Sequence, residues 1–259
     1  SIKMRNLLRK QGKKSFNPGK AAAMAFLTIK DPTTIKAIRT GMIDWGYKAQ
    51  RFAHDLGKKF GLIQPQVKAP PATLGKAPLI SPTVRAQVIH FINKPMPGNL
   101  PKKTSRALLD IEDDKVIPVI RDPKKANGDS DAVFYFPGCG SERLFSQVGL
   151  ATQAMLYHVG AHTVLPPGYL CCGYPQTAAG EDDKGQRITT DNRVLFHRVS
   201  NTLNYLDIKT VIVSCGTCMD QLQKYEFEKI FPGCRLLDIH EYLMEKGVKL
   251  EGVNGVKYM

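Results

Sequence analysis

The chain has 259 residues, of which 42% are hydrophobic and 23% are charged, and these proportions are ordinary for a globular protein. This length allows one substantial core and an additional segment. The longest unbroken apolar run, residues 21–27, is far shorter than the roughly 20 residues that span a bilayer, so the sequence predicts no transmembrane helix. The net charge of +14 raises the question of an anionic partner.

Most of the positive charge lies in the first predicted segment, residues 1–62, which we expect to be helical. Residues 1–60 contain fourteen Lys and Arg residues against three Asp residues. A basic segment of this kind can bind nucleic acid, an anionic membrane surface or an acidic partner subunit. Aromatic residues do not alternate with these charges as they do in nucleic-acid stacking platforms, so we expect no nucleic-acid partner. Peripheral membrane association and simple solvated helix faces remain open.

Apolar residues in this segment recur at spacings of three and four, which predicts a helix of about seven turns with a continuous apolar face. Asp31 fits the start of the helix, and Gly57 or Gly61 fits its end. We expect the face to pack on other parts of a larger protein, and therefore to be poorly buried in this chain alone. Docking on a membrane surface is the alternative. The face consists of Ile35, Ile38, Met42, Trp45, Ala49, Phe52, Leu56 and Phe60.

Residues 63–130 contain many prolines and few periodic runs, which predicts an extended linker. From residue 131 to residue 259, short β-branched and aromatic runs alternate with helical periodicity. The predicted strands cover 132–136, 162–165, 210–214 and 235–238, and the predicted helices cover 141–159, 187–206, 217–229 and 239–246. This alternation is typical of Rossmann-like βαβ units, so the expected fold class is α/β with a parallel sheet.

Five of the six cysteines follow three of these predicted strands. Cys139 stands alone in FPGCGS. Cys171 and Cys172 are adjacent in YLCCGYP, and Cys215 and Cys218 form the motif SCGTC. Because the carboxyl ends of parallel strands meet at one edge of a sheet, we expect these five thiols to converge there.

The adjacent cysteine pair favours an iron–sulfur cluster over a zinc site. Neighbouring side chains diverge and rarely ligate one ion together, whereas a cluster offers each thiolate its own iron. Four-cysteine zinc sites more often use two CxxC motifs, and this chain has one. Five thiols exceed the four of an ordinary cluster, so one would bridge two irons or stand free as a reactive ligand. The sixth thiol, Cys234, precedes a predicted strand, and we expect it to be a structural core residue that lies apart.

Glycines flank these cysteines in every motif. A residue without a Cβ lets backbone amides approach the sulfides of a cluster closely, which makes these glycines candidate cofactor-binding residues. Turn geometry alone is the alternative explanation. The four glycines are Gly138, Gly140, Gly173 and Gly216.

These motifs resemble the cysteine-rich CCG domain of heterodisulfide reductase subunits and of the iron–sulfur subunits of glycolate and D-lactate oxidases. The wider stretch 134–247 is similar to the C-terminal region of large FAD-linked oxidases with fused iron–sulfur modules. The resemblance implies a 4Fe-4S cluster, which is noncubane in the heterodisulfide reductase branch. It makes all five cysteines candidate metal ligands.

The chain departs from the family pattern in two respects. The interval between the cysteine pair and the CxxC motif is longer than usual, which we attribute to a polar loop at 179–185. The family generally has two CCG repeats, and this chain shows one, at 131–259, so we expect a fragment whose second repeat begins at 255–259. The resemblance implies that FAD lies in an associated domain and not in this segment. A flavin-containing domain or subunit and a further iron–sulfur domain are therefore the expected partners.

We expect an iron–sulfur electron-transfer module of a flavin-linked oxidoreductase. The resemblance implies oxidation of a 2-hydroxy acid such as D-lactate or glycolate, or heterodisulfide-reductase-like chemistry. The alternative is a non-catalytic interaction domain, stabilised by zinc or without metal, that docks a partner subunit through its basic helix. Cysteines in this spacing favour a reducing compartment, so the expected location is cytoplasmic, either free or on the inner face of the membrane.

Overall fold

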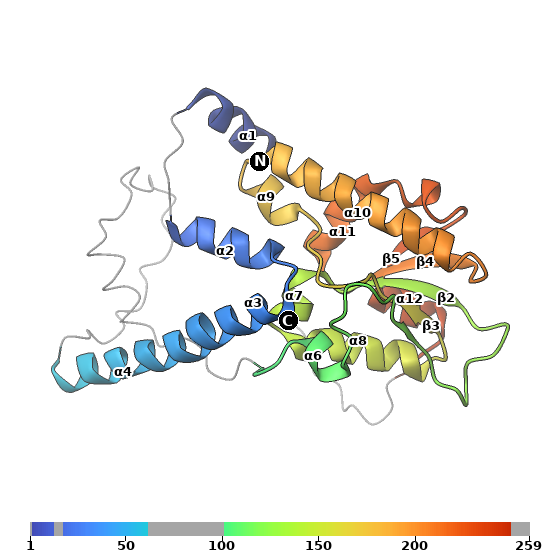
Figure 1. The fold of residues 1–259 in the computed structure, drawn as a ribbon, viewed down its shortest axis with the longest axis horizontal. Helices are drawn as coiled ribbons and strands as arrows, with labels where there is room; N and C mark the ends of the chain where they lie inside the picture. Colours follow the sequence, from blue (N-terminus) through green and yellow to red (C-terminus); the bar gives the residue numbers. More distant parts are fainter. Residues whose placement is uncertain (1, 13–17, 62–100, 250–259) are drawn as a thin grey trace. The chain divides into compact units, whose positions relative to one another are not determined.

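The structure is a computed structural model that describes residues 2–12, 18–61 and 101–249 (Figure 1). Two sequence predictions lie outside these residues. They are the start of a second repeat at 255–259 and most of the proline-rich linker.

The chain divides into two compact units. The first unit combines residues 1–35 with residues 103–259, and the second unit comprises residues 36–102. The first unit contains all six cysteines and the five strands found among the described residues. It also contains the last part of the predicted linker, which forms α6 (Ser105–Leu109) and an edge strand. The boundaries predicted at residues 62 and 130 stay predictions.

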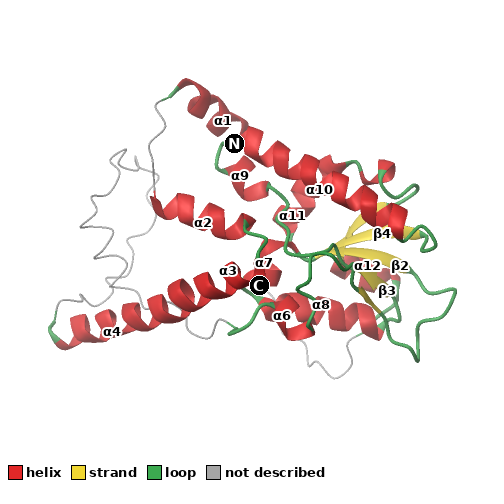
Figure 2. Ribbon diagram, viewed as in Figure 1, coloured by secondary structure: helices red, strands yellow, loops and turns green. Residues whose placement is uncertain are grey.

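A five-stranded sheet forms the centre of the first unit (Figure 2). Its strands are β1 (Val119–Ile120), β2 (Ala132–Phe136), β3 (His162–Val164), β4 (Ile208–Val213) and β5 (Arg235–Asp238). They lie in the order β1-β3-β2-β4-β5, with β2 to β5 parallel and β1 antiparallel to β3. The α/β fold class with a parallel sheet is confirmed. The antiparallel strand β1 was not predicted.

Helices connect the parallel strands, as βαβ units require. The helices after β2 are α7 (Gly138–Arg143) and α8 (Ser146–His158), and those after β3 are α9 (Tyr174–Ala178) and α10 (Asp182–Thr202). After β4 comes α11 (Gly216–Leu222), which continues as two 3-10 turns (Gln223–Tyr225 and Phe227–Lys229), and after β5 comes α12 (Ile239–Glu245).

The structure corrects two of the predicted helices. The single helix expected at 141–159 is broken at Phe145, whose φ of −109° and ψ of 61° leave the helical region. Helix α10 begins at Asp182, so part of the predicted polar loop at 179–185 is the first turn of a helix. Asp182 and Asp183 suit that position, because carboxylates stabilise the positive end of the helix dipole.

Apolar side chains cover both faces of the sheet, because successive residues of a strand point to opposite faces. Phe134 and Phe136 of β2 belong to one buried cluster, which includes Phe196 of α10. Val133 and Tyr135, which alternate with them, belong to a second buried cluster together with residues of α8 and α12. Burial on both faces explains why the strands read as continuous apolar runs.

The basic segment contributes two helices to the first unit, α1 (Ile2–Gln11) and α2 (Pro18–Thr28). Arg9 of α1 donates from Nη1 to the carbonyl oxygen of Ala179 at 2.7 Å and to Glu181 Oε1 at 2.9 Å. Arg143 donates from Nη1 to the carbonyl oxygen of Phe26 in α2. These bonds hold both helices to the segments that follow β2 and β3.

The predicted long helix is present as a helical run from Pro32 to Lys59, but its middle is π-helical. It consists of α3 (Pro32–Ile38), a π-helical segment (Arg39–Trp45) and α4 (Gly46–Lys59). The apolar face is poorly buried over its second half, as expected, since Trp45 is 67% exposed and Phe52 is 68% exposed. Among the helices that the structure describes, none is long and apolar enough to cross a membrane.

Candidate metal centre

Three adjacent strands place the five cysteines at the carboxyl edge of the sheet. Cys139 lies in the first turn of α7, directly after β2. Cys171 and Cys172 lie in the loop between β3 and α9. Cys215 and Cys218 begin α11, directly after β4. Since β3, β2 and β4 are neighbours in the sheet, their loops meet at the same edge.

The five thiols form a continuous row of contacts. Each lies within hydrogen-bonding reach of the next, in the order Cys139, Cys171, Cys172, Cys218 and Cys215. All are buried except the last, which is partly exposed. No three His, Cys, Asp or Glu side chains of the described residues surround a single point where one metal ion could bind. A row of thiols suits a group with several metal atoms better than it suits one ion.

The thiols of this row do not ionise alike, because each hydrogen bond favours the thiolate of one partner and the neutral thiol of the other. The hydrogen bond with Cys218 lowers the pKa of Cys215 to about 4, and the hydrogen bond with Cys171 lowers the pKa of Cys172. The hydrogen bonds to Cys172 and Cys215 raise the pKa of Cys218. The hydrogen bond with Cys171, together with burial, raises the pKa of Cys139.

Cys171 has a thiol neighbour on each side. Its hydrogen bond with Cys139 lowers its pKa, but the hydrogen bond with Cys172 and burial outweigh this effect and raise the pKa to about 11. A bound metal supplies positive charge, which allows neighbouring cysteines to be thiolates at the same time. The donor set therefore fits a group of metal ions.

Two of the four flanking glycines are required by the backbone. Gly138 has a φ of +74°, and a Cβ there would lie 2.7 Å from Cys218 Sγ. Gly173 has a φ of +89°, and a Cβ there would lie 2.9 Å from the carbonyl oxygen of Gly185. At Gly140 and Gly216 a Cβ would meet no atom within 4 Å. Turn geometry therefore accounts for the first two, and a cofactor-binding role for all four stays a prediction.

A buried guanidinium that the sequence did not reveal lies beside the row of thiols. The side chain of Arg143 is fully buried, and its charge partly opposes the hydrogen bond with Cys171 and the burial that raise the pKa of Cys139. The proximity of Cys139 and Cys171 in turn favours the charged form of Arg143, against the effect of burial. The one sequence signal was its place in GCGSER, where charged residues directly follow a buried strand and its cysteine.

Arg143 belongs to a larger buried charge cluster. Arg106 Nε lies 2.5 Å from Glu142 Oε1, and both side chains are almost fully buried. The guanidinium carbons of Arg106 and Arg143 lie 5.7 and 5.6 Å from the centroid of the Tyr169 ring. Burial raises the pKa of Glu142 in spite of Arg106. The Tyr169 hydroxyl donates to Glu112 Oε1 at 2.7 Å, so Glu112 also belongs to the cluster. The two arginines place positive charge beside the thiols, which favours thiolates or an anionic metal group there.

The backbone of the cysteine pair is held by side chains of the helical layer. Asn192 Nδ2 donates to the carbonyl oxygen of Cys171 at 2.8 Å. The hydroxyl of Tyr225 donates to the carbonyl oxygen of Cys172 at 3.0 Å, and Asn192 also donates to that hydroxyl at 2.9 Å. Such bonds fix the orientation of the two thiols without occupying their sulfur atoms.

The sixth thiol lies apart from the row. Cys234 directly precedes β5, which runs parallel to β4 with Arg235 level with Thr210. It therefore lies at the amino edge of the sheet, whereas Cys215 lies at the carboxyl edge. Burial raises the pKa of Cys234 to about 11, and its charged neighbours are Glu228 and Lys209.

Comparison with known families identifies this region. A family model described as a cysteine-rich domain, CCG, matches residues 133–223, which contain all five cysteines of the row. This region is a CCG domain. The position of the CCG domain, from β2 to the end of α11, coincides with the part of the sheet that brings the thiols together.

Several curated relatives share this domain at low identity. An uncharacterized iron–sulfur protein of Methanococcus maripaludis is 23% identical over 150 residues, which are 58% of this chain and 26% of the relative. The probable glycolate oxidase iron–sulfur subunit of Bacillus subtilis is 30% identical over 94 residues, 36% of this chain and 20% of the relative. A fumarate reductase (CoM/CoB) subunit of Methanothermobacter marburgensis is 27% identical over 122 residues, 46% of this chain and 23% of the relative.

The matched region spans only about a fifth to a quarter of each of these relatives. The chain is thus a distant homologue of iron–sulfur proteins, among them oxidoreductase subunits. No solved structure matches the chain.

Proposed function

We propose that the CCG domain binds a 4Fe-4S cluster through all five cysteines of the row and transfers electrons in a flavin-linked oxidoreductase. The observation that supports this most strongly is the uninterrupted contact among five thiols from three strands. A fifth thiol exceeds the need of a cubane cluster, which favours a noncubane form. The bound cluster would supply one-electron transfer. The ligands are Cys139, Cys171, Cys172, Cys215 and Cys218.

The surrounding residues have separate tasks in this proposal. Burial of four of the thiols excludes water from the cluster. Arg143 offsets the negative charge that thiolates bring into the interior. Cys215 is the partly exposed member, so its side of the cluster is the side that an electron donor or acceptor can approach.

We further propose that the electron donor is a flavin-containing domain or subunit and that another iron–sulfur domain receives or relays the electrons. The names of two relatives support a 2-hydroxy acid such as glycolate or D-lactate as the substrate of the whole enzyme. One is the glycolate oxidase iron–sulfur subunit, and the other is lactate utilization protein A of an Exiguobacterium species, 28% identical over 93 residues. Heterodisulfide-reductase-like chemistry is the alternative, supported by the CoM/CoB fumarate reductase relative.

Metal analysis of anaerobically prepared protein tests the proposal. The chain is purified without oxygen, reconstituted with iron and sulfide, and analysed for both elements and by electron paramagnetic resonance. We expect about four irons and four sulfides per chain and a paramagnetic signal in one oxidation state. Stoichiometric zinc, or no bound metal under these conditions, would reject the cluster.

A second function is favoured by the exposed apolar face of the helical run. Trp45, Phe52, Leu56 and Phe60 are exposed on a helix that also carries Lys and Arg. Such a face suits a non-catalytic domain, with zinc or without metal, that docks a partner subunit. Zinc in place of iron in the same preparation would support this function.

A further inference from the structure

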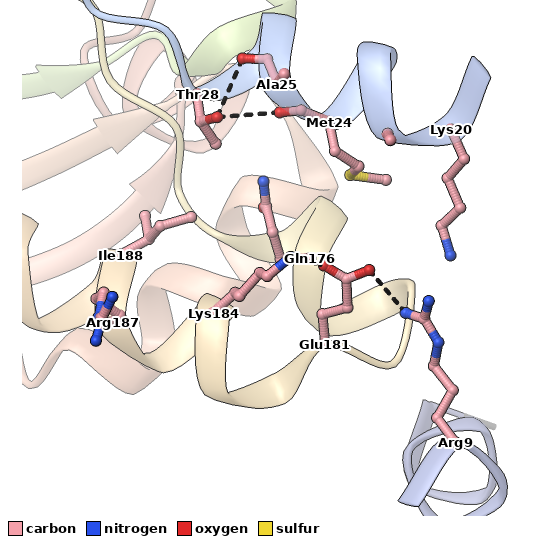
Figure 3. Close-up of a pocket in the computed structure, with 11 residues that line it drawn as sticks. Arg9, Lys20, Met24, Ala25, Thr28, Gln176, Glu181, Lys184, Arg187 and Ile188 are labelled. Carbon is pink, nitrogen blue, oxygen red and sulfur yellow. Dashed lines mark hydrogen bonds and ion pairs between the residues drawn. The ribbon is translucent and has the colours of Figure 1, made fainter. Parts of the chain in front are cut away.

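The first unit contains a cavity that has no role in the proposed binding of the cluster. It has a volume of about 490 Å³, which lies within the range of small-molecule sites (Figure 3). Helix α2 contributes an apolar wall with Ala21, Met24 and Ala25, and Ile188 of α10 adds to it. Arg9 closes one side from α1 and is held there by Glu181 (Figure 3). The cavity thus combines two segments that lie far apart in the sequence, residues 9–28 and residues 176–188.

The charges around this cavity are mostly positive. Four cations and one carboxylate line it, namely Arg9, Lys20, Lys184, Arg187 and Glu181. Arg9 and Lys184 both form ion pairs of 2.9 Å with Glu181, which offsets part of their charge. Asp182 and Asp183 line a neighbouring hollow, but Lys20 and Arg187 do not line that hollow. Lys20 and Arg9 both donate to the carbonyl oxygen of Ala179, so these two cations lie together at one end of the cavity, whereas Arg187 lies at the other end (Figure 3).

The cavity adjoins the row of thiols. Thr28 and Ile188 line both the cavity and a small crevice of about 40 Å³, and Cys171 lines that crevice. A molecule in the cavity would therefore have one end close to Cys171 while its other end met the cationic residues.

We propose that this cavity binds a small organic anion, a carboxylate or phosphate with an apolar body. The anionic group is held by Lys20 and Arg9, which lie together at one end of the cavity, because charge-assisted hydrogen bonds to such groups are strong. The apolar body packs against Met24 and Ile188. Gln176 also lines the cavity and is 3% exposed.

Calorimetric titration of the 259-residue chain with phenyl phosphate tests this site, with phenol as the neutral analogue. We expect phenyl phosphate to bind and phenol to bind about tenfold more weakly or worse. Lys20→Gln should weaken phenyl phosphate binding about tenfold, since it removes one charge-assisted contact.

Arg198→Gln is the matched control. Arg198 lies on α10, about three turns after Arg187, is exposed and does not line the cavity, so its loss should leave the affinity unchanged. The site would be rejected by absence of phenyl phosphate binding at millimolar concentration, by equal binding of phenol, or by equal effects of the Lys20 and Arg198 variants. The titrations are run on cluster-free protein as well, so binding by a chain that takes up no iron keeps the cavity proposal and rejects only the cluster.

Discussion

Gly138 lies so close to Cys218 that a Cβ on the glycine would be 2.7 Å from the cysteine Sγ. Its φ of +74° is also one that residues with a Cβ rarely adopt. The turn after β2 and the start of α11 are therefore in contact through the backbone of one residue and the sulfur of the other. This contact fixes the distance between two of the loops that carry the thiols.

Gly138→Ala should destabilise the chain and displace Cys218. The positive φ alone costs about 1–2 kcal/mol in a residue with a Cβ, and the clash adds to it. Urea unfolding measures the stability, and iron content after reconstitution measures the displacement. Gly128→Ala is the control, because a Cβ there meets no atom within 4 Å and its φ is not in the left-handed region. Equal behaviour of the two variants would contradict the contact.

Cysteine-to-serine substitutions should distinguish the cysteines of the row, which bind the cluster, from Cys234, which does not. Cys171→Ser and Cys215→Ser should abolish or convert the paramagnetic signal, because an alcohol is a far poorer iron ligand than a thiolate. Cys234→Ser should retain the signal and lose at most about 1 kcal/mol of stability, since Cys234 is only partly buried. Equal loss of iron in all three variants would show that Cys234 cannot be distinguished from the five proposed ligands.

Removing the charge of Arg143 should lower the reduction potential of the bound cluster. In Arg143→Met the buried cation beside Cys139 and Cys171 is lost, so adding an electron becomes less favourable. We expect a shift of about 60 mV or more toward negative potential, equivalent to about tenfold in a one-electron equilibrium. Redox titration followed by electron paramagnetic resonance measures it. Arg143→Lys keeps the charge and should stay near the native potential, whereas equal shifts in both variants would indicate a purely steric role.

Asp131 should contribute stability that depends on pH. Burial acts to raise its pKa, but hydrogen bonds from Lys246 and from the hydroxyl of Tyr242 outweigh this effect and lower it. A carboxyl group with a lowered pKa stabilises the fold above its ordinary pKa of about 3.9, and the stabilisation is lost as the pH falls through the folded-state value.

Asp131→Asn should therefore cost about 0.5 kcal/mol at pH 7, a small value because the carboxylate is partly exposed. The difference from the native chain should shrink as the pH falls below the ordinary pKa and vanish below the lowered folded-state pKa. Urea unfolding at several pH values measures it. The exposed Asp129→Asn serves for comparison, and a difference between Asp131→Asn and the native chain that stays the same at every pH would contradict the role of ionisation.

The four parallel strands could be predicted because burial on both faces leaves a continuous run of apolar, β-branched and aromatic residues, as in Ala132–Phe136. The convergence of the five cysteines followed from those strands and from the common edge of a parallel sheet. Strand β1 could not be predicted in the same way, because two residues are too few to show a period.

Helix α10 was expected to begin later because its first turn is polar. Asp182 and Asp183 are residue types that are common in loops, but in the first turn of a helix their carboxylates stabilise the positive end of the helix dipole. The buried cluster of Arg106, Glu142 and Arg143 escaped prediction for a different reason. Arg106 and Glu142 are 36 residues apart, and a charged residue gives no sign in the sequence that its partner will be buried with it.

Strand β1 also forms one edge of the sheet, and its properties determine whether another chain can pair with that edge. It has two residues, it is preceded by Pro118 and followed by Arg121, and it runs against the direction of β3. A strand this short has few unpaired backbone groups with which a strand of another chain could form hydrogen bonds. A proline and a charged residue at its ends further disfavour such strand pairing. Strand β3, whose residues are all buried, is covered by it. The CCG domain is therefore protected on this side against the edge-to-edge association through which open sheets aggregate.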